Sequence, residues 1–186
     1  MENKRLLIGN DHYRLIHSKE QIRARIIELA QEIKHDYSQR TLPPILLFVL
    51  TGGIYFGKDL SGVLDGMGFT HHIDTIGLKR YNGDSNGGEV KLISQPHASL
   101  SGRDVIIIED VIDEGITMNY LDRFLKIMPT PPASISYAAL LLRDEHGPLE
   151  FDVKYIGFPV GPGWVVGCGM DAEQAYRGLL DIFIKE

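Results

Sequence analysis

Along most of this sequence, short runs of apolar residues alternate with segments in which apolar residues recur at helical spacing. Apolar runs predict strands at 45–50, 73–78, 90–93, 105–108, 135–142, 155–158 and 164–167. Apolar residues at helical spacing predict helices at 22–33, 56–67 and 118–128. Ser18 with Gln21 three residues later has the pattern of a capping box, so the first helix is expected to begin at Ser18. This alternation indicates an α/β fold with a mainly parallel central sheet flanked by helices.

A polar, glycine-rich stretch, 79–88, connects two of the predicted strands. It is too long for a tight turn, so we expect a long hairpin loop between the strands on either side. No linker-like segment divides the chain, and we therefore expect 1–186 to form a single domain. The piece from about residue 150 to 186 is expected to form a smaller cap on it.

Composition narrows the class of protein. The chain has 24% charged residues and a net charge of −6, so neither nucleic acid nor an anionic membrane surface is an expected partner. A lone cysteine, Cys168, excludes an intramolecular disulfide and fits a reducing compartment. No apolar stretch has the roughly 20 residues of a membrane span, and the first residues lack the apolar region of a signal peptide. These features predict a cytoplasmic protein.

Candidate chemistry is concentrated in the segment 105–117, where a β-branched run ends in acidic residues. The carboxylates Glu109, Asp110, Asp113 and Glu114 fall within six positions, and Gly115 and Thr117 follow them. Carboxylates this close repel one another unless a cation or a hydrogen-bonding group joins them. The turn that follows leads into a helix N-terminus, which suits a phosphate. The segment therefore predicts a site for a phosphorylated sugar and a divalent cation.

This segment resembles the phosphoribosyl pyrophosphate (PRPP) motif of type I phosphoribosyltransferases, and it looks most like the hypoxanthine-guanine branch. Three other segments are similar to parts of that family, so the resemblance spans nearly the whole chain. Residues 50–53 look like the small loop that contacts pyrophosphate. Residues 78–81, with the glycines after them, look like the flexible loop that closes over the site. Residues 164–177 look like the segment that holds the purine. The resemblance implies a core at about 36–149 and a hood made from the N-terminal segment and about 150–186.

The resemblance also implies a role for individual residues. Glu109 and Asp110 would hold the ribose hydroxyls or Mg²⁺, and Asp113 would be the general base at N7 of the purine. The residues implied for ribose and its 5′-phosphate are Glu109, Asp110, Asp113, Glu114, Gly115, Ile116 and Thr117. Those implied for pyrophosphate and the loops are Thr51, Gly52, Arg80, Tyr81 and Arg177. Those implied for the purine are Arg143, Trp164, Val165 and Asp171, and Asp171 would also help to hold a second Mg²⁺.

In the family the peptide that corresponds to Leu50–Thr51 can be cis. The sequence departs from the family pattern at four positions. The family usually has Ser or Thr in place of Glu114, often Lys or a polar residue in place of Ile116, often Lys or Arg in place of Thr51, and normally Lys in place of Arg143. Arginine is longer and planar, so Arg143 leaves the base preference open.

The leading hypothesis is an enzyme of purine salvage that transfers the phosphoribosyl group of PRPP to hypoxanthine or guanine, and a xanthine-preferring enzyme is the alternative. A second class is a regulator on the same fold that senses PRPP or nucleotides and binds RNA or DNA, but the acidic chain has no clustered Lys/Arg run. A receiver-like signalling domain is a third class. It would need an acidic pair at the end of the first strand, where this chain has Leu50–Gly53. The family implies a homodimer or a homotetramer.

Overall fold

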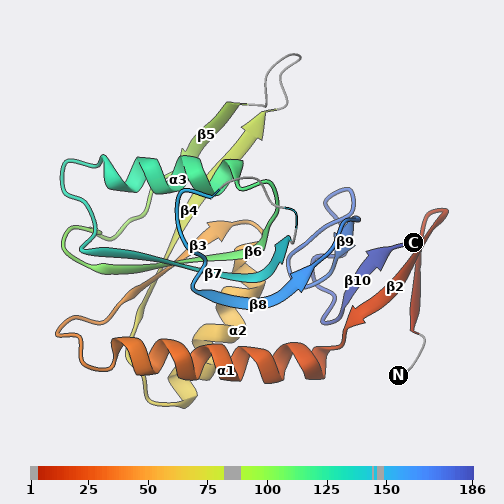
Figure 1. Ribbon diagram of the computed structural model, residues 1–186, viewed down its shortest axis with the longest axis horizontal. Helices are drawn as coiled ribbons and strands as arrows, with labels where there is room; N and C mark the ends of the chain where they lie inside the picture. Colours follow the sequence, from red (N-terminus) through yellow and green to blue (C-terminus); the bar gives the residue numbers. More distant parts are fainter. Residues whose placement is uncertain (1–3, 82–88, 144, 146–148) are drawn as a thin grey trace.

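A six-stranded sheet lies at the centre of the protein (Figure 1). The structure is a computed structural model that describes residues 4–81, 89–143, 145 and 149–186. In sheet order the strands are β5 (Glu89–Ser94), β4 (His72–Tyr81), β3 (Ile45–Leu50), β6 (Asp104–Ile112), β7 (Ser134–Arg143) and β8 (Tyr155–Val160). All neighbouring pairs are parallel except β4 and β5. The predicted α/β fold with a mainly parallel sheet is confirmed.

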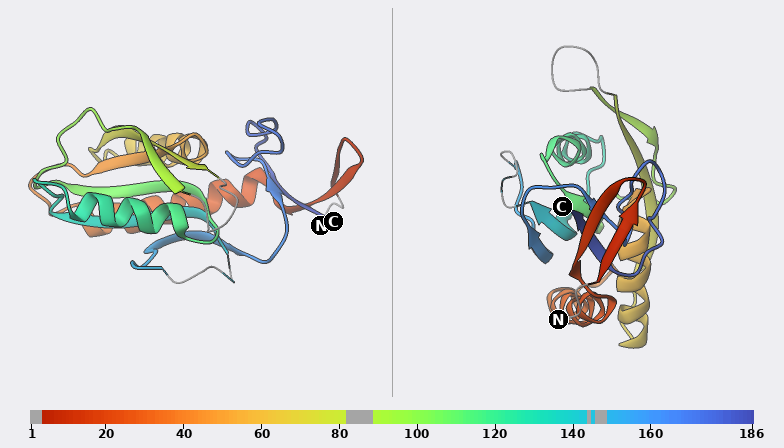
Figure 2. Two further views of the ribbon diagram at one scale, coloured as in Figure 1. Left: turned by 90° about the horizontal axis from the view of Figure 1, so that it is seen from above. Right: turned by 90° about the vertical axis from the view of Figure 1, so that its right-hand side faces the viewer.

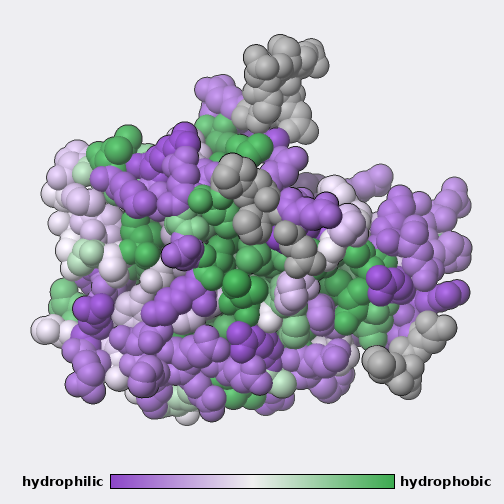
Figure 3. All heavy atoms as spheres, viewed as in Figure 1, coloured by the Kyte–Doolittle hydropathy of each residue, from purple (hydrophilic) through white to green (hydrophobic). Residues whose placement is uncertain are grey.

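Helices cover both faces of this sheet because its inner strands are apolar on both sides. Helices α1 (Lys19–Tyr37) and α2 (Gly53–Gly66) lie below the sheet in Figure 1, and α3 (Ile116–Lys126) lies above it. Alternate residues of β3 enter the two cores: Leu46 and Phe48 pack with α1 and α2, whereas Leu47 packs on the side of α3. Ser18 caps α1 with the predicted capping box. Mostly hydrophilic residues cover the outer side of α1 (Figure 3).

A second, four-stranded antiparallel sheet forms the hood at one end of the molecule (Figures 1 and 2). Its strands, in order, are β1 (Arg5–Ile8), β2 (Asp11–His17), β10 (Ile182–Lys185) and β9 (Val165–Val166). Tyr13, Val166 and Phe183 form its small apolar core. The apolar runs did not predict β1, β2 and β10. Polar residues interrupt β2, and the apolar runs of β1 and β10 are only three residues long.

Two features of the fold differ from the expected pattern. Strand β6 extends to Ile112, so Glu109 and Asp110 lie within the strand and not after it. The reason is that β7 remains apolar along its length and continues to pair with β6, for example at Val111 with Leu141. Helix α1 and strand β8 pack with the central sheet, so the hood is smaller than the ranges 1–35 and 150–186 suggest.

The hairpin of β4 and β5 is present as predicted, but the loop 82–88 that joins these strands lies outside the described residues. Among the described residues, no helix has both the length and the apolar character needed to span a membrane.

Candidate active site

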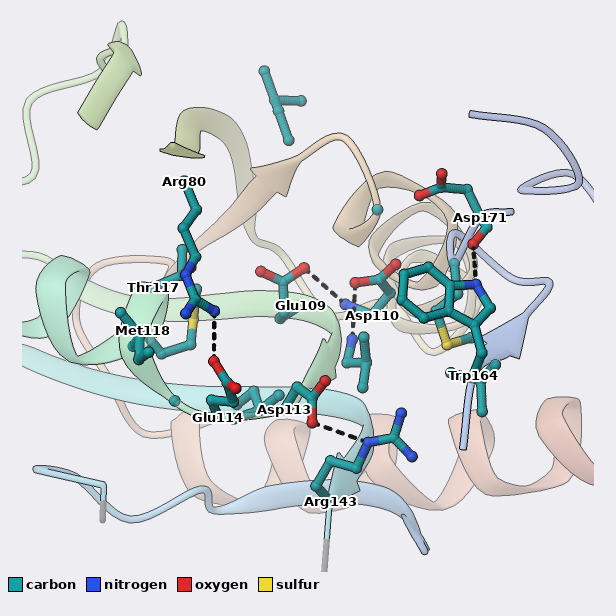
Figure 4. Close-up of a pocket in the computed structure, with 18 of the residues that line it drawn as sticks. Arg80, Glu109, Asp110, Asp113, Glu114, Thr117, Met118, Arg143, Trp164 and Asp171 are labelled. Atoms are coloured by element: carbon teal, nitrogen blue, oxygen red, sulfur yellow. Dashed lines mark hydrogen bonds and ion pairs between the residues drawn. The ribbon is translucent and has the colours of Figure 1, made fainter. Parts of the chain in front are cut away.

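A pocket of about 350 Å³ opens where the carboxyl ends of β6 and β7 face the hood (Figure 4). The carboxyl edge of a parallel sheet is the usual place for a ligand in an open α/β fold. Its lining includes most of the predicted site residues: Gly52, Arg80, Glu109, Asp110, Asp113, Glu114, Gly115, Ile116, Thr117, Arg143, Trp164, Val165, Asp171 and Arg177. One pocket thus collects residues that are spread over more than a hundred positions of the chain.

The acidic pair Glu109 and Asp110 lies on the floor of this pocket (Figure 4). The carboxylate of Glu109 accepts a hydrogen bond from the backbone N–H of Asp110 at 3.0 Å, and the Asp110 carboxylate accepts one from Val111 at 2.8 Å. Burial and the charge of Asp110 raise the pKa of Glu109 well above its usual value. Burial also raises the pKa of Asp110. The pair is therefore poised to gain from a cation or from hydroxyl groups that share its charge.

The backbone of the loop after β3 lies directly against the acidic pair. A Cβ atom added to Gly52 would be 2.1 Å from Oδ2 of Asp110. From the hood side, a Cβ on Gly169 would be 2.4 Å from the carbonyl oxygen of Gly52, and Gly169 has a φ of +108°. The Leu50–Thr51 peptide is cis, as the resemblance implied. Glycine is needed at both positions because loop, acid pair and hood come this close together.

Glu114, Gly115 and Thr117 form the turn that leads into α3. Gly115 has a φ of +77°, which favours glycine, and it stands directly before the first residue of the helix. The helix N-terminus here presents backbone N–H groups to the pocket, which suits an anion. The carboxylate of Glu114 accepts a hydrogen bond from Arg80 of β4 at 2.5 Å. The unexpected acidic residue is therefore paired with a cation that the resemblance placed over pyrophosphate.

The opposite end of the pocket is lined by Asp113, Arg143 and Trp164. Arg143 is the last residue of β7, and its Nε donates to the Asp113 carboxylate at 3.0 Å. The same guanidinium donates to the carbonyl groups of Gly161 and Gly163. The indole Nε1 of Trp164 donates to the backbone carbonyl of Asp171 at 2.8 Å, and the side chain is largely exposed at the pocket rim. This end offers an aromatic face, N–H donors and one carboxylate acceptor.

Asp171 and Arg177 belong to a loop of the hood with an unusual backbone. Glu173, Gln174 and Tyr176 all have positive φ values, between 52° and 68°. The carboxylate of Asp171 pairs with Arg177 at 2.5 Å and accepts a hydrogen bond from the N–H of Gln174 at 2.8 Å. Arg177 also donates to the carbonyl of Gly169. These bonds hold the guanidinium of Arg177 close enough to the acidic pair to oppose the rise in its pKa.

Two predicted residues are not among those that line the pocket. Thr51 is exposed outside it, and the side chain of Tyr81 lies outside the described part of the structure. The sequence reasoning in turn missed Leu50, Val111, Ile112, Met118 and Met170, which line the pocket, and Gly169, which lies against Gly52. The apolar ones look like ordinary core residues in the sequence, whereas the glycines around Cys168 were a visible signal of close backbone approach.

Carboxylates in the pocket are candidate ligands for a metal ion. Among the described residues no three His, Cys, Asp or Glu side chains gather as a metal cluster. Glu109 and Asp110 still fit Mg²⁺, which is commonly held by one or two carboxylates together with water and substrate phosphates. Asp171 is paired with Arg177 and would meet a metal only indirectly.

Comparison with known proteins settles the family. A sequence model of the family described as "Phosphoribosyl transferase domain" matches residues 12–173, which include every described element of the site except Arg177. The chain belongs to the phosphoribosyltransferase family. The acidic segment on β6, the small loop after β3 and the turn into α3 all lie within the matched range.

The relatives of this phosphoribosyltransferase extend over most of its length. It is 33% identical to the hypoxanthine-guanine phosphoribosyltransferase of Crithidia fasciculata over 176 residues, which cover 92% of this chain and 84% of that protein. It is 34% identical to the bifunctional protein TilS/HprT of Listeria monocytogenes, but spans only 25% of that protein's length. The structure of the Trypanosoma cruzi hypoxanthine phosphoribosyltransferase in complex with the product IMP matches with a TM-score of 0.86 and 28% identity, covering 97% of both chains.

Proposed function

We propose that this phosphoribosyltransferase transfers the 5-phosphoribosyl group of PRPP to a 6-oxopurine and releases pyrophosphate. Hypoxanthine and guanine are the proposed bases, with IMP and GMP as products. The observation that carries the proposal is the division of one pocket into two ends. One end has the acidic pair and the helix N-terminus for a phosphorylated sugar, and the other has Trp164, Arg143 and Asp113 for a flat base.

The base end favours an oxo group over an amino group at the purine 6-position. A guanidinium has only N–H donors, so Arg143 can bind a 6-oxo oxygen but has no acceptor for a 6-amino group. A carboxylate has only acceptors when ionised, and Asp113 can therefore accept the N–H of N7. Trp164 can cover the ring with its face, which adds affinity without selecting among bases.

In the proposed reaction the bond from C1 of the ribose to the pyrophosphate oxygen breaks, and a bond from N9 of the purine to C1 forms. The purine loses its N7 proton to the carboxylate of Asp113, so the product base is neutral. Glu109 and Asp110 would bind the ribose hydroxyls and Mg²⁺, and the metal would neutralise charge on the departing pyrophosphate. Arg177 is held close to the acidic pair and can bind oxygens of the same leaving group.

The test is a panel of free bases with the purified protein. Incubation with PRPP, Mg²⁺ and hypoxanthine or guanine should yield the nucleoside monophosphate and pyrophosphate in equal amounts, whereas adenine should yield neither. Xanthine tests the alternative preference. Absence of product with all three oxopurines refutes the proposal. Asp113→Asn should lower kcat by roughly 10²-fold or more while PRPP binding persists, because an amide cannot accept the N7 proton.

Two further properties are proposed with this function. We place the enzyme in the cytoplasm, in keeping with its single cysteine, and cell fractionation tests this. We also propose a homodimer or homotetramer. Ile54 and Tyr55 expose apolar surface on α2, and Leu180 does so in the hood, which supports association between copies. A monomer by light scattering at working concentrations would contradict it.

A further inference from the structure

The guanidinium of Arg143 joins the ends of two strands that do not pair with each other. Its own strand, β7, lies between β6 and β8 in the sheet. Nε donates to Oδ1 of Asp113, in the turn after β6, at 3.0 Å. Nη2 donates to the carbonyl of Gly163 at 2.7 Å and Nη1 to that of Gly161, both in the turn after β8. The Arg143 side chain is only 12% exposed, so the guanidinium itself is held inside the pocket wall although the Asp113 carboxylate that it contacts is open to water.

Both segments that Arg143 holds need an external restraint. Asp113 is 63% exposed, and among the described residues its carboxylate has Arg143 as its ion-pair partner. The turn after β8 contains two glycines, and a Cβ at Gly161 would meet nothing within 4 Å. Pro162 restricts the middle of this turn, whereas the glycines on either side leave the flanking backbone the widest choice of conformations. Arg143 therefore adds a restraint that the sequence of the turn does not supply by itself. The turn leads directly into Trp164, the expected stacking residue.

Trp164 is in turn fixed to the hood through its bond to the carbonyl of Asp171. The contacts therefore form a continuous series from Asp113 through Arg143 and Gly163 to Trp164. This series of contacts spans the base end of the pocket, from the proposed proton acceptor to the aromatic face (Figure 4). Three of the five N–H donors of a guanidinium are used in it, which leaves two that can face a ligand.

We propose that Arg143 is a positioning residue that fixes the spacing between Asp113 and Trp164 before a base binds. This inference rests on the proposed function, because Asp113 and Trp164 are given their roles there. Lysine cannot replace the contact set: its N–H donors lie on one nitrogen, whereas the acceptors here meet three nitrogens spread along a planar fork. The arginine that departs from the family pattern thus organises the site as well as donating to the base.

The experiment compares Arg143→Lys with Arg25→Lys in the full chain. Arg25 is a matched control because its guanidinium also donates to backbone carbonyls of β8, at Ile156, but from α1 and far from the pocket. Trp164 is the only tryptophan, so its fluorescence reports on the turn after β8 without labelling. The readouts are the fluorescence anisotropy of Trp164 in the free protein, which reports how freely the indole moves, followed by KM for hypoxanthine and for PRPP.

Arg143→Lys should lower the fluorescence anisotropy of Trp164, because the released turn lets the exposed indole move more freely. It should raise KM for hypoxanthine about tenfold or more and leave KM for PRPP within about twofold, because a tenfold change corresponds to about 1.4 kcal/mol, the scale of one hydrogen bond to a charged group. Arg25→Lys should change none of these values. Arg143→Met, which keeps an unbranched apolar stem but removes every donor, should show the same fluorescence change if the lysine variant does not fold.

Unchanged Trp164 fluorescence in a folded Arg143 variant overturns the proposal, even if KM for the base rises, because a direct contact alone would then explain the loss. A parent protein that makes no nucleotide refutes the proposed function instead. The fluorescence comparison is unaffected by that failure, because it needs no substrate. The two ideas can therefore fail separately.

Discussion

The close approach of Gly52 to Asp110 allows a sharp test of the site, by the substitution Gly52→Ala. Gly52 has ordinary helical dihedral angles, φ −63° and ψ −46°, so alanine is not strained by its own backbone. The added Cβ would nevertheless be 2.1 Å from Oδ2 and 2.4 Å from Cγ of Asp110. Ordinary van der Waals contact begins near 3.4 Å, so the carboxylate must withdraw by more than about 1 Å.

The size of the effect follows from that displacement. Overpacking of a close contact costs typically about 1–3 kcal/mol of unfolding free energy. For a chain of this size, that lowers Tm by roughly 2–4 °C per kcal/mol. Displacement of a catalytic group by about 1 Å costs on the order of 10²-fold in rate, which corresponds to about 2.7 kcal/mol. We therefore expect kcat/KM for PRPP to fall about a hundredfold, whereas KM for the base changes little.

The control is Gly62→Ala in α2, where a Cβ meets nothing within 4 Å. Alanine is favoured over glycine in a helix by about 0.5–1 kcal/mol, so this variant should be slightly more stable and fully active. Thermal unfolding by circular dichroism and initial rates at varied PRPP measure both effects. A Gly52→Ala protein with parental Tm and kcat/KM would refute the inferred contact between the small loop and Asp110.

Three further variants test other contacts. Tyr137→Phe leaves the buried carboxylate of Asp122 without a 2.7 Å hydrogen bond and should cost about 1.5–3 kcal/mol in urea unfolding, with activity retained; a loss below about 0.5 kcal/mol would contradict this. Glu109→Gln should abolish turnover yet raise Tm at neutral pH. Because the pKa of Glu109 is raised in the folded protein, its contribution to stability is full below the ordinary value of 4.5 and is lost as the pH rises. The gain in Tm of the variant should therefore vanish in acid, and an equal Tm of variant and parent at neutral pH would argue against this reasoning. Glu114→Gln should lower KM for PRPP at low salt, because it removes a negative charge beside the expected phosphate. Its ion pair with Arg80 is exposed, so stability should change by less than about 1 kcal/mol. A higher KM would mean that the ion pair helps binding.

The central sheet and the acidic segment could be predicted from the sequence, because buried parallel strands are continuous apolar runs and the acids stand at fixed spacing after one of them. The inner strands, α1 with its cap, and the place of Asp113 at the sheet edge agree with the structure. The hood strands β1 and β10 could not be predicted in this way, because the apolar run of each is only three residues long.

The sequence also could not predict which charged side chains pair with each other. Nothing in the local pattern indicates that Arg80 pairs with Glu114, since the two are 34 positions apart and meet through the packing of β4 against the turn before α3. The same holds for Arg143 and Asp113, which are 30 positions apart and are brought together by the pairing of β6 with β7. Spacing identifies which groups are present, whereas sheet topology decides which groups neutralise one another.

The hood sheet has a consequence for the order in which the protein folds. Strand β10 pairs on one side with β2 and on the other with β9, which carries Val165. The contact between β2 and β10 joins segments far apart in sequence, closes one of the largest loops and is expected to form late. The turn that we propose for phosphate can therefore assemble from the central sheet, while β9, at the end that we propose for the base, is completed only when β10 pairs with it. Native-state hydrogen exchange should show β2 and β10 opening at lower free energy than β3 and β6. Under the proposed function, a molecule in that partly open state would still bind a sugar phosphate but would lack the surface on which a purine stacks.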